Sequence, residues 1–284
     1  MASARQLSKS GGLKSAASRQ KLKQQQPNDR GVATVPGSSG EGSSNYPYMK
    51  EEHVLTLGEH FYNRTMVLVQ QAARSSKESS LWDIADGIYK DVEGYISKEA
   101  QVRAFALLMY NKGLEDAQNA ETVAKLCSRL ASLEAEGLKF RSPLLKQLQE
   151  DFISRATWKD NDPNRWLAFT CYLCCLFRHL KIGDNYINAL VEPVFTCLDS
   201  LVTDADSSDE EMKCGCNQLK ELGPTLEELK PAQMDILLNM MKEKLLGPKS
   251  SHFSRLLLLE IIELRASGWH LTDTQQQYYS EIFC

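Results

Sequence analysis

The chain has 284 residues, of which 42% are hydrophobic and 25% are charged, which is the composition of an ordinary globular protein long enough to bury a substantial core. Its net charge is −4, but residues 1–30 hold seven Lys/Arg and one Asp, a net +6 that leaves −10 on the remainder. Nonspecific binding of nucleic acid needs a surface rich in Lys and Arg that neutralises the phosphates. The acidic remainder of the chain therefore excludes such binding by the chain as a whole.

Residues 1–45 are rich in Ser, Gly, Gln and basic residues and contain almost no large apolar ones. Such a segment cannot bury enough surface to offset the entropy lost on ordering, so the sequence predicts a disordered basic tail followed by one folded domain over residues 46–284. We find no apolar secretory signal at the N-terminus and no run of about 18 apolar residues. We therefore expect a cytoplasmic protein, present also in the nucleus, whose eight cysteines are thiols.

Beyond the tail, apolar residues recur with helical spacing, and no segment alternates as a strand does. In the first part of the domain this spacing predicts helices over residues 52–74, 80–94, 97–112, 119–135 and 140–158. Asp162 followed by Pro163 then predicts a helix start, with Asp as the N-cap and Pro at the first helical position. The helix that follows is apolar nearly all round, which indicates a central, buried element.

The second part of the domain is divided by Gly, Pro and Ser. We expect a helix start at Gly183-Asp184 and a kink or split at Pro193. Residues 207–211 are an acidic, Ser-containing helix start, and Gly223-Pro224 should break the next helix. Another helix is expected over 231–246, and a last long one runs from a cap at Ser250 or Ser251 to Gly268. About ten helices with short links predict an all-α, HEAT-repeat-like α-solenoid of about five antiparallel helix pairs.

Two cysteine groups resemble metal ligands at first sight, namely Cys171-x-x-Cys174 with Cys175, and Cys214-x-Cys216. Zinc knuckles need turn residues around each pair, whereas both groups lie in predicted helices, so buried structural thiols are the better interpretation. The sequence contains no HExxH, GxSxG or dinucleotide-binding pattern, and its five histidines stand apart from partners that would make a catalytic pair. We expect no enzymatic activity, no cofactor and no metal; a helical hydrolase or a metalloprotein built on the cysteines is the alternative that bound zinc would support.

Four stretches carry a resemblance to a known family: FRSPLLKQLQEDF at 140–152, ALVEPVFTCL at 189–198, LLLLEIIELRASGW at 256–269 and QYYSE at 277–281. With these stretches, residues 79–279 resemble the middle domain of eukaryotic initiation factor 4 gamma. Within that family they are most similar to the group comprising the histone stem-loop-binding-protein-interacting protein and the cap-binding-complex-dependent translation initiation factor. The resemblance implies a HEAT-repeat fold of five helix pairs.

The resemblance also implies a non-enzymatic adaptor in mRNA translation. Its expected partners are translation initiation factors, a DEAD-box RNA helicase, and the cap-binding complex or a stem-loop-binding protein, with RNA and a second copy of the chain as further partners. As partner-binding residues we select polar side chains beside the matching stretches: Arg141, Asn164, Arg165, Glu260, Glu263 and Arg265. The alternative function is direct RNA binding by the basic N-terminal tail, which predicts steep salt dependence that disappears on deletion of the tail.

Overall fold

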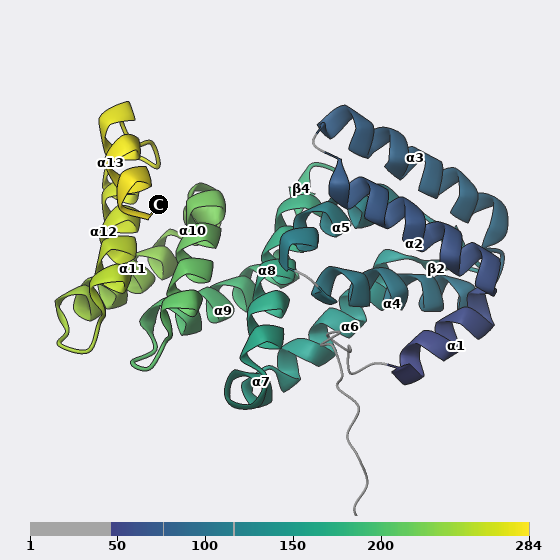
Figure 1. The fold of residues 1–284 in the computed structure, drawn as a ribbon, viewed down its shortest axis with the longest axis horizontal. Helices are drawn as coiled ribbons and strands as arrows, with labels where there is room; N and C mark the ends of the chain where they lie inside the picture. The colour runs from purple at the N-terminus through teal and green to yellow at the C-terminus, as the bar shows by residue number, and fades with distance from the viewer. Residues whose placement is uncertain (1–46, 76, 116, 284) are drawn as a thin grey trace, which may run out of the picture. The chain divides into compact units, whose positions relative to one another are not determined.

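The computed structural model describes residues 47–75, 77–115 and 117–283, so the predicted disordered tail lies outside the described residues. Within these ranges the chain forms thirteen α-helices, one 3₁₀ helix and two short β-hairpins (Figure 1). No helix in the same ranges is both long enough and apolar enough to cross a bilayer.

The first half of the described chain contains seven helices and one hairpin. Their bounds are α1 (Pro47–Leu57), α2 (Glu59–Arg74), α3 (Glu78–Tyr95), α4 (Glu99–Glu115), α5 (Ala117–Leu130), β1 (Glu134–Ala135), β2 (Leu138–Lys139), α6 (Arg141–Ser154) and α7 (Ala156–Asn161). The second half contains α8 (Pro163–His179), β3 (Lys181–Ile182), β4 (Asn185–Tyr186), η1 (Asn188–Leu190), α9 (Val191–Thr203), α10 (Asp209–Leu229), α11 (Pro231–Leu246), α12 (His252–Ala266) and α13 (Asp273–Phe283).

Helices pack mainly on near neighbours in the chain. The helix α8 packs most extensively on α5 and also contacts α4, α9 and α10, while α10 contacts α9, α11 and α12. Figure 1 shows the same succession, from α1–α6 at one end of the folded part to α11–α13 at the other. The predicted all-α, HEAT-repeat-like architecture is therefore confirmed, with one continuous apolar core between successive layers.

The central helix is the one that the Asp162-Pro163 start predicts. The Asp162 side chain accepts a hydrogen bond from the Arg165 amide at 3.1 Å, and Pro163 is the first helical residue. Ten of the seventeen residues of α8 are buried, Trp166, Phe169, Tyr172 and Phe177 among them. The helix is buried on nearly all sides because other helices pack around it, as its apolar sequence requires.

Three predictions in the first half of the domain are wrong in detail. The predicted helix over 52–74 is two helices, because Gly58 has a φ of 75°, which an α-helix does not allow. The helix predicted to reach residue 135 ends at Leu130 and gives way to the antiparallel hairpin β1–β2, whose turn includes Gly137 at a φ of 81°. The predicted helix over 140–158 is divided between α6 and α7.

Three predictions in the second half also need correction. Gly183, with a φ of 62°, forms the turn of hairpin β3–β4 and not a helix start. Pro193 does not split α9, because it is the third residue of that helix, where the amide of any residue lacks an intrahelical acceptor. Pro224 does not break its helix: α10 continues to Leu229, since packing of its buried face outweighs the lost backbone hydrogen bond.

Three other helix starts agree with the local signals, whereas α13 was not predicted. The side chain of Ser208 caps α10 and forms a capping box with Glu211, as expected for the acidic start at 207–211. The helix predicted over 231–246 is α11. Ser251, one of the two expected caps, accepts a hydrogen bond from the Ser254 amide at 2.9 Å, and Gly268 at a φ of 71° follows the end of α12.

Candidate protein-docking site

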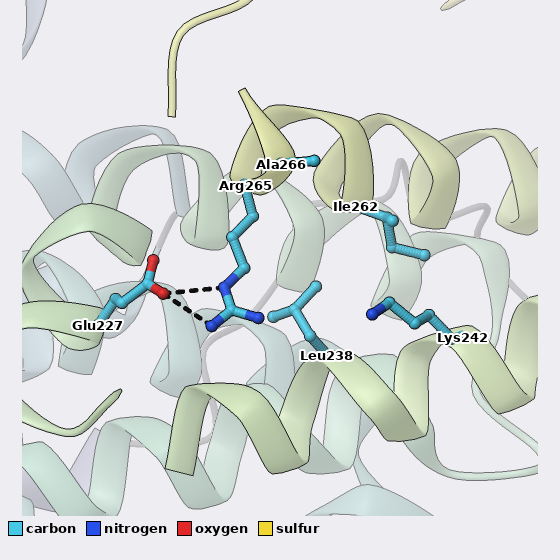
Figure 2. A pocket seen from close by; sticks show the side chains of 6 residues that line it. All are labelled: Glu227, Leu238, Lys242, Ile262, Arg265 and Ala266. Carbon is cyan, nitrogen blue, oxygen red and sulfur yellow. Dashed lines mark hydrogen bonds and ion pairs between the residues drawn. The ribbon is translucent and has the colours of Figure 1, made fainter. Parts of the chain in front are cut away.

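An ion-pair network joins the ends of α10, α11 and α12 around Arg265, one of the predicted partner-binding residues. Its guanidinium donates two hydrogen bonds to Oε1 of Glu227, at 2.9 and 2.7 Å, and also bonds to the Asp235 carboxylate. Figure 2 shows Arg265 extending from α12 toward Glu227. The guanidinium therefore serves first to hold three helices together.

The second oxygen of Glu227 accepts a hydrogen bond from Nε1 of Trp269 at 2.6 Å. The indole lies directly on Gly223 of α10, where an added Cβ would be 2.1 Å from two ring atoms. Trp269 has a φ of 65°, and its amide donates to the Leu264 carbonyl at 2.7 Å, so the chain reverses tightly after α12. Because Gly223 has no side chain, the indole seats against the backbone of α10 and reaches Glu227.

These contacts set the charge state of the network. The hydrogen bonds from Arg265 are the main reason that the pKa of Glu227 lies below its ordinary value, with a smaller contribution from Trp269, and the same bonds raise the pKa of Arg265. Both groups are therefore ionised near neutral pH.

Beside this network lies a hollow of about 300 Å³ between α10, α11 and α12. Its lining, drawn in Figure 2, consists of Glu227, Leu238, Lys242, Ile262, Arg265 and Ala266. Leu238 lies between Arg265 and Lys242 in that view, and Ile262 faces Lys242. Among the described residues Lys242 forms no ion pair, so its ammonium is available to a group outside the chain. The hollow thus combines an apolar centre with one unneutralised positive charge.

A second hollow, of about 260 Å³, lies on the opposite side of α11, toward the end of α9. Its lining includes Thr203, Ala205, Met240, Lys244 and Pro248. The crest of α11 exposes 61% of Ile236 and 39% of Met240, which are four residues apart and so lie on one side of the helix, and Met240 also lines the second hollow. We define the α11 surface as Ile236, Met240, Lys242 and the linings of the two hollows.

Two other predicted partner-binding residues lie on α12 but contact neighbouring helices. Glu260, predicted to contact a partner, instead has a buried side chain that forms an ion pair with Lys220 of α10 at 2.6 Å. Glu263 is half-buried and accepts a hydrogen bond from the Tyr279 hydroxyl at 2.9 Å, which ties α13 to α12. Both carboxylates therefore face helices of their own chain.

The remaining three predicted residues lie on α6 and α8. Asn164 is exposed and Arg141 is half-buried at the start of α6. The Arg165 guanidinium lies 4.2 Å from the ring centre of Trp158 and 3.3 Å from the carboxylate of Asp151. Asp151 is buried, which raises the pKa of its carboxyl, and it also accepts a hydrogen bond from Tyr110 at 2.9 Å. Arg165 and Asp151 thus join α8 to α4 and α6, away from the α11 surface.

A polar cluster that the sequence analysis did not predict lies between α5 and α8. Glu121 bonds to the Arg178 guanidinium, and its other oxygen lies 2.8 Å from Nε2 of His179. Burial raises the pKa of Glu121, but these hydrogen bonds outweigh it, and the pKa is lowered. Cys175 adjoins this cluster, but burial raises its pKa strongly, so the thiol stays protonated. The cluster is a structural link and not an activated nucleophile.

The cysteine prediction is confirmed in part. Cys174, Cys175 and Cys216 are buried, whereas Cys171 and Cys214 are partly exposed, with their sulfur atoms 3.2 Å apart. In the described part of the chain, no three His, Cys, Asp or Glu side chains are arranged to hold a metal ion.

The residues selected from the sequence include Arg265, which lines the first hollow, but not Ile236, Met240, Lys242 or Glu227. A signal for the first two was present, because the apolar residues of 231–246 occupy more of the helix circumference than Met234, Leu237, Leu238 and Met241 need for burial. No signal marked Glu227, since its partners lie 38 and 42 residues away.

The family profile and the related proteins point to the same family. The MIF4G domain family profile matches residues 83–268. The chain is 36% identical over 193 residues to a Xenopus tropicalis protein named CBP80/20-dependent translation initiation factor, and the match covers 67% of this chain but 33% of that relative. It is 35% identical over 177 residues to the MIF4G domain-containing protein B of Danio rerio, covering 61% of this chain and 80% of the relative. The human MIF4G domain-containing protein is 31% identical over 179 residues, covering 61% and 81%.

Proposed function

Since this chain belongs to the MIF4G domain family, we propose that it is a non-enzymatic adaptor in mRNA translation initiation, which binds protein partners through the α11 surface. The translation role rests on the name of the Xenopus relative, of which the chain spans about a third. The predicted partners are translation initiation factors, a DEAD-box helicase, and cap-bound or stem-loop-bound proteins. The cytoplasm, where initiation occurs, is the compartment that we propose.

The observation that carries this proposal is the pair of exposed apolar side chains on the crest of α11, Ile236 and Met240, flanked by two hollows. Protein interfaces depend on a few apolar or aromatic anchors that insert into pockets and exclude water, with a polar rim around them. Here the hollows receive a partner's apolar side chains, and Ile236 and Met240 insert into the partner.

The charges around the first hollow favour one kind of occupant. Lys242 has no ion-pair partner among the described residues, whereas Arg265 is neutralised by Glu227 and Asp235. A partner segment with apolar residues on one side and a carboxylate positioned for Lys242 fits this arrangement. We therefore propose an amphipathic, acidic segment of a translation initiation protein as the occupant.

Rigidity of the surface supports the same function. The Arg265–Glu227–Asp235 network and the seat of Trp269 on Gly223 fix α10, α11 and α12 relative to each other. A preorganised surface loses little conformational entropy on binding, so more of the contact energy appears as affinity.

The test compares the full chain with Ile236→Asp in capture from cytoplasmic extract, with and without nuclease, read by mass spectrometry. Ile153→Asp is the matched control, because Ile153 is an aliphatic residue on another helix with a comparable exposed fraction of 70%. We expect nuclease-resistant recovery of translation initiation proteins with the wild type and Ile153→Asp, and at least about a tenfold loss with Ile236→Asp.

Other outcomes would redirect the proposal. Loss of every translation partner after nuclease treatment would favour RNA binding by the basic tail, and deletion of residues 1–44 would then abolish binding. Equal recovery with all three proteins would exclude the α11 surface. A concentration-dependent dimer that Ile236→Asp dissociates, measured by analytical ultracentrifugation, would identify a second copy of the chain as the occupant.

A further inference from the structure

Cys171 of α8 and Cys214 of α10 face each other across the joint between their helices. Their sulfur atoms are 3.2 Å apart, and both side chains are partly exposed. The other five described cysteines are buried. This pair therefore differs from the rest in having both a thiol partner and access to solvent.

The distance is short enough for a covalent bond to need only a small adjustment. A disulfide requires the sulfur atoms to approach to about 2.05 Å, which is about 1 Å closer than they stand. Rotation about the Cα–Cβ bonds of the two cysteines can bring their sulfur atoms closer by a distance of this order. Within α8, by contrast, the nearest cysteines to Cys171 are Cys174 and Cys175, whose buried thiols have raised pKa values.

The two sulfur atoms are not equivalent. The hydrogen bond from Cys214 lowers the pKa of Cys171, although burial acts in the opposite direction, and the same bond raises the pKa of Cys214. The thiolate is the reactive form of cysteine, so Cys171 is the sulfur that attacks an oxidant, and Cys214 is positioned to resolve the product.

We propose that Cys171 and Cys214 are a reversible oxidative modification site, at which hydrogen peroxide converts the two thiols into a disulfide between α8 and α10. The Cys171 sulfur attacks the peroxide, the O–O bond breaks, and a sulfenic acid and water are formed. The Cys214 sulfur then attacks the sulfenic sulfur, the S–O bond breaks, and a second water leaves with the Cys214 proton. In sum, two thiols lose two electrons and two protons, and a hydrogen peroxide molecule becomes two waters.

The cross-link has a defined mechanical effect. It closes a loop between residues 43 positions apart and links α8 covalently to α10, which α9 separates from α8 along the sequence. Closing such a loop restricts the unfolded chain, so the oxidised protein should unfold about 5 °C or more above the reduced protein. The inference is independent of the α11 surface and of the adaptor function.

The test treats the reduced full chain with hydrogen peroxide, alkylates the remaining thiols, and digests with trypsin. Cleavage after Arg165, Arg178, Lys213 and Lys220 releases peptides 166–178 and 214–220. We expect these two peptides joined with loss of two hydrogens, fragment ions that assign Cys171 and Cys214, and reversal by dithiothreitol. The matched control is Cys216→Ala, which removes a buried thiol of the same peptide and should retain the cross-link.

Cys171→Ala and Cys214→Ala should each abolish the joined peptides and the rise in unfolding temperature. The wild type alone also tests the proposal, in case either variant fails to fold. Oxidation of folded wild type to a Cys171 sulfinic acid without the joined peptides would overturn it. A cross-link through Cys174, Cys175 or Cys216 instead would overturn it equally.

Discussion

Trp269 reaches Glu227 because Gly223 leaves the backbone of α10 uncovered beneath the indole. Replacing Gly223 with Ala puts a methyl group at 2.1 Å from two ring atoms, so the indole must move and lose its hydrogen bond. We expect Gly223→Ala to destabilise the fold by about 1–3 kcal/mol in urea unfolding. Gly87→Ala is the control, because nothing lies within 4 Å of that added carbon and alanine favours a helix interior by about 0.5–1 kcal/mol. Equal changes in both variants would contradict this account.

The contribution of the same network to folding stability depends on pH through Glu227. Its folded-state pKa lies below its ordinary value, chiefly because of Arg265, so its contribution to stability is present above the unfolded pKa and is lost as pH falls through the folded pKa. We expect Glu227→Gln to destabilise the protein by about 1 kcal/mol at pH 7. The difference from wild type should shrink as pH falls below about 4.3, the ordinary value for glutamate.

Urea unfolding of wild type and Glu227→Gln at several pH values measures this difference. Glu228→Gln is the control, because it removes the same charge one residue away at an exposed position without a described hydrogen bond or ion pair. That control should stay within about 0.5 kcal/mol of wild type at pH 7. A Glu227→Gln difference that grows on acidification would contradict the assigned role of Arg265.

At the scale of single elements, helix ends follow local chemistry closely. Ser208 caps α10 by accepting from the Glu211 amide at 3.2 Å, while the Glu211 carboxylate bonds back to the Ser208 amide and to Nε1 of Trp166. The local pattern at 207–211 predicts this cap, because an N-cap needs only residues within one turn. Continuity through Pro224 was unpredictable, because it depends on what the helix packs against.

The stabilising effect of the Ser208 cap can be tested by mutation. Ser208→Ala removes the acceptor for the Glu211 amide and should lower the free energy of unfolding by about 1 kcal/mol. Ser142→Ala, near the start of α6, changes an exposed serine without a described hydrogen bond and should have an effect below about 0.5 kcal/mol. Thermal or urea unfolding distinguishes the two, and an equal loss would show that serine content and not capping matters.

At the scale of the whole molecule, burial is concentrated in the middle of the helix series. The helix α8 contacts α4, α5, α9 and α10, whereas among the described residues of α13 Tyr279 alone is buried. In solenoids each layer is stabilised by its immediate neighbours, so terminal layers open more easily than central ones.

Native-state hydrogen exchange tests this gradient. We expect amides of α8 to exchange with global unfolding and those of α13 to exchange at least about tenfold faster. Mass spectrometry of peptides from the two helices measures both rates in one sample. Equal protection of α8 and α13 would contradict a layered distribution of stability.

The sequence by itself determined the helical class, the central helix after Asp162-Pro163, most helix boundaries and the resemblance that the family match confirms. Each of these depends on signals within one or two helical turns or on matching core residues. Only the tertiary structure decided that Glu260 is buried and that Arg265 is neutralised within the chain. It also brought Cys171 to Cys214. The physical reason is distance along the chain: these contacts join residues about 40 positions apart, and local spacing carries no information about them.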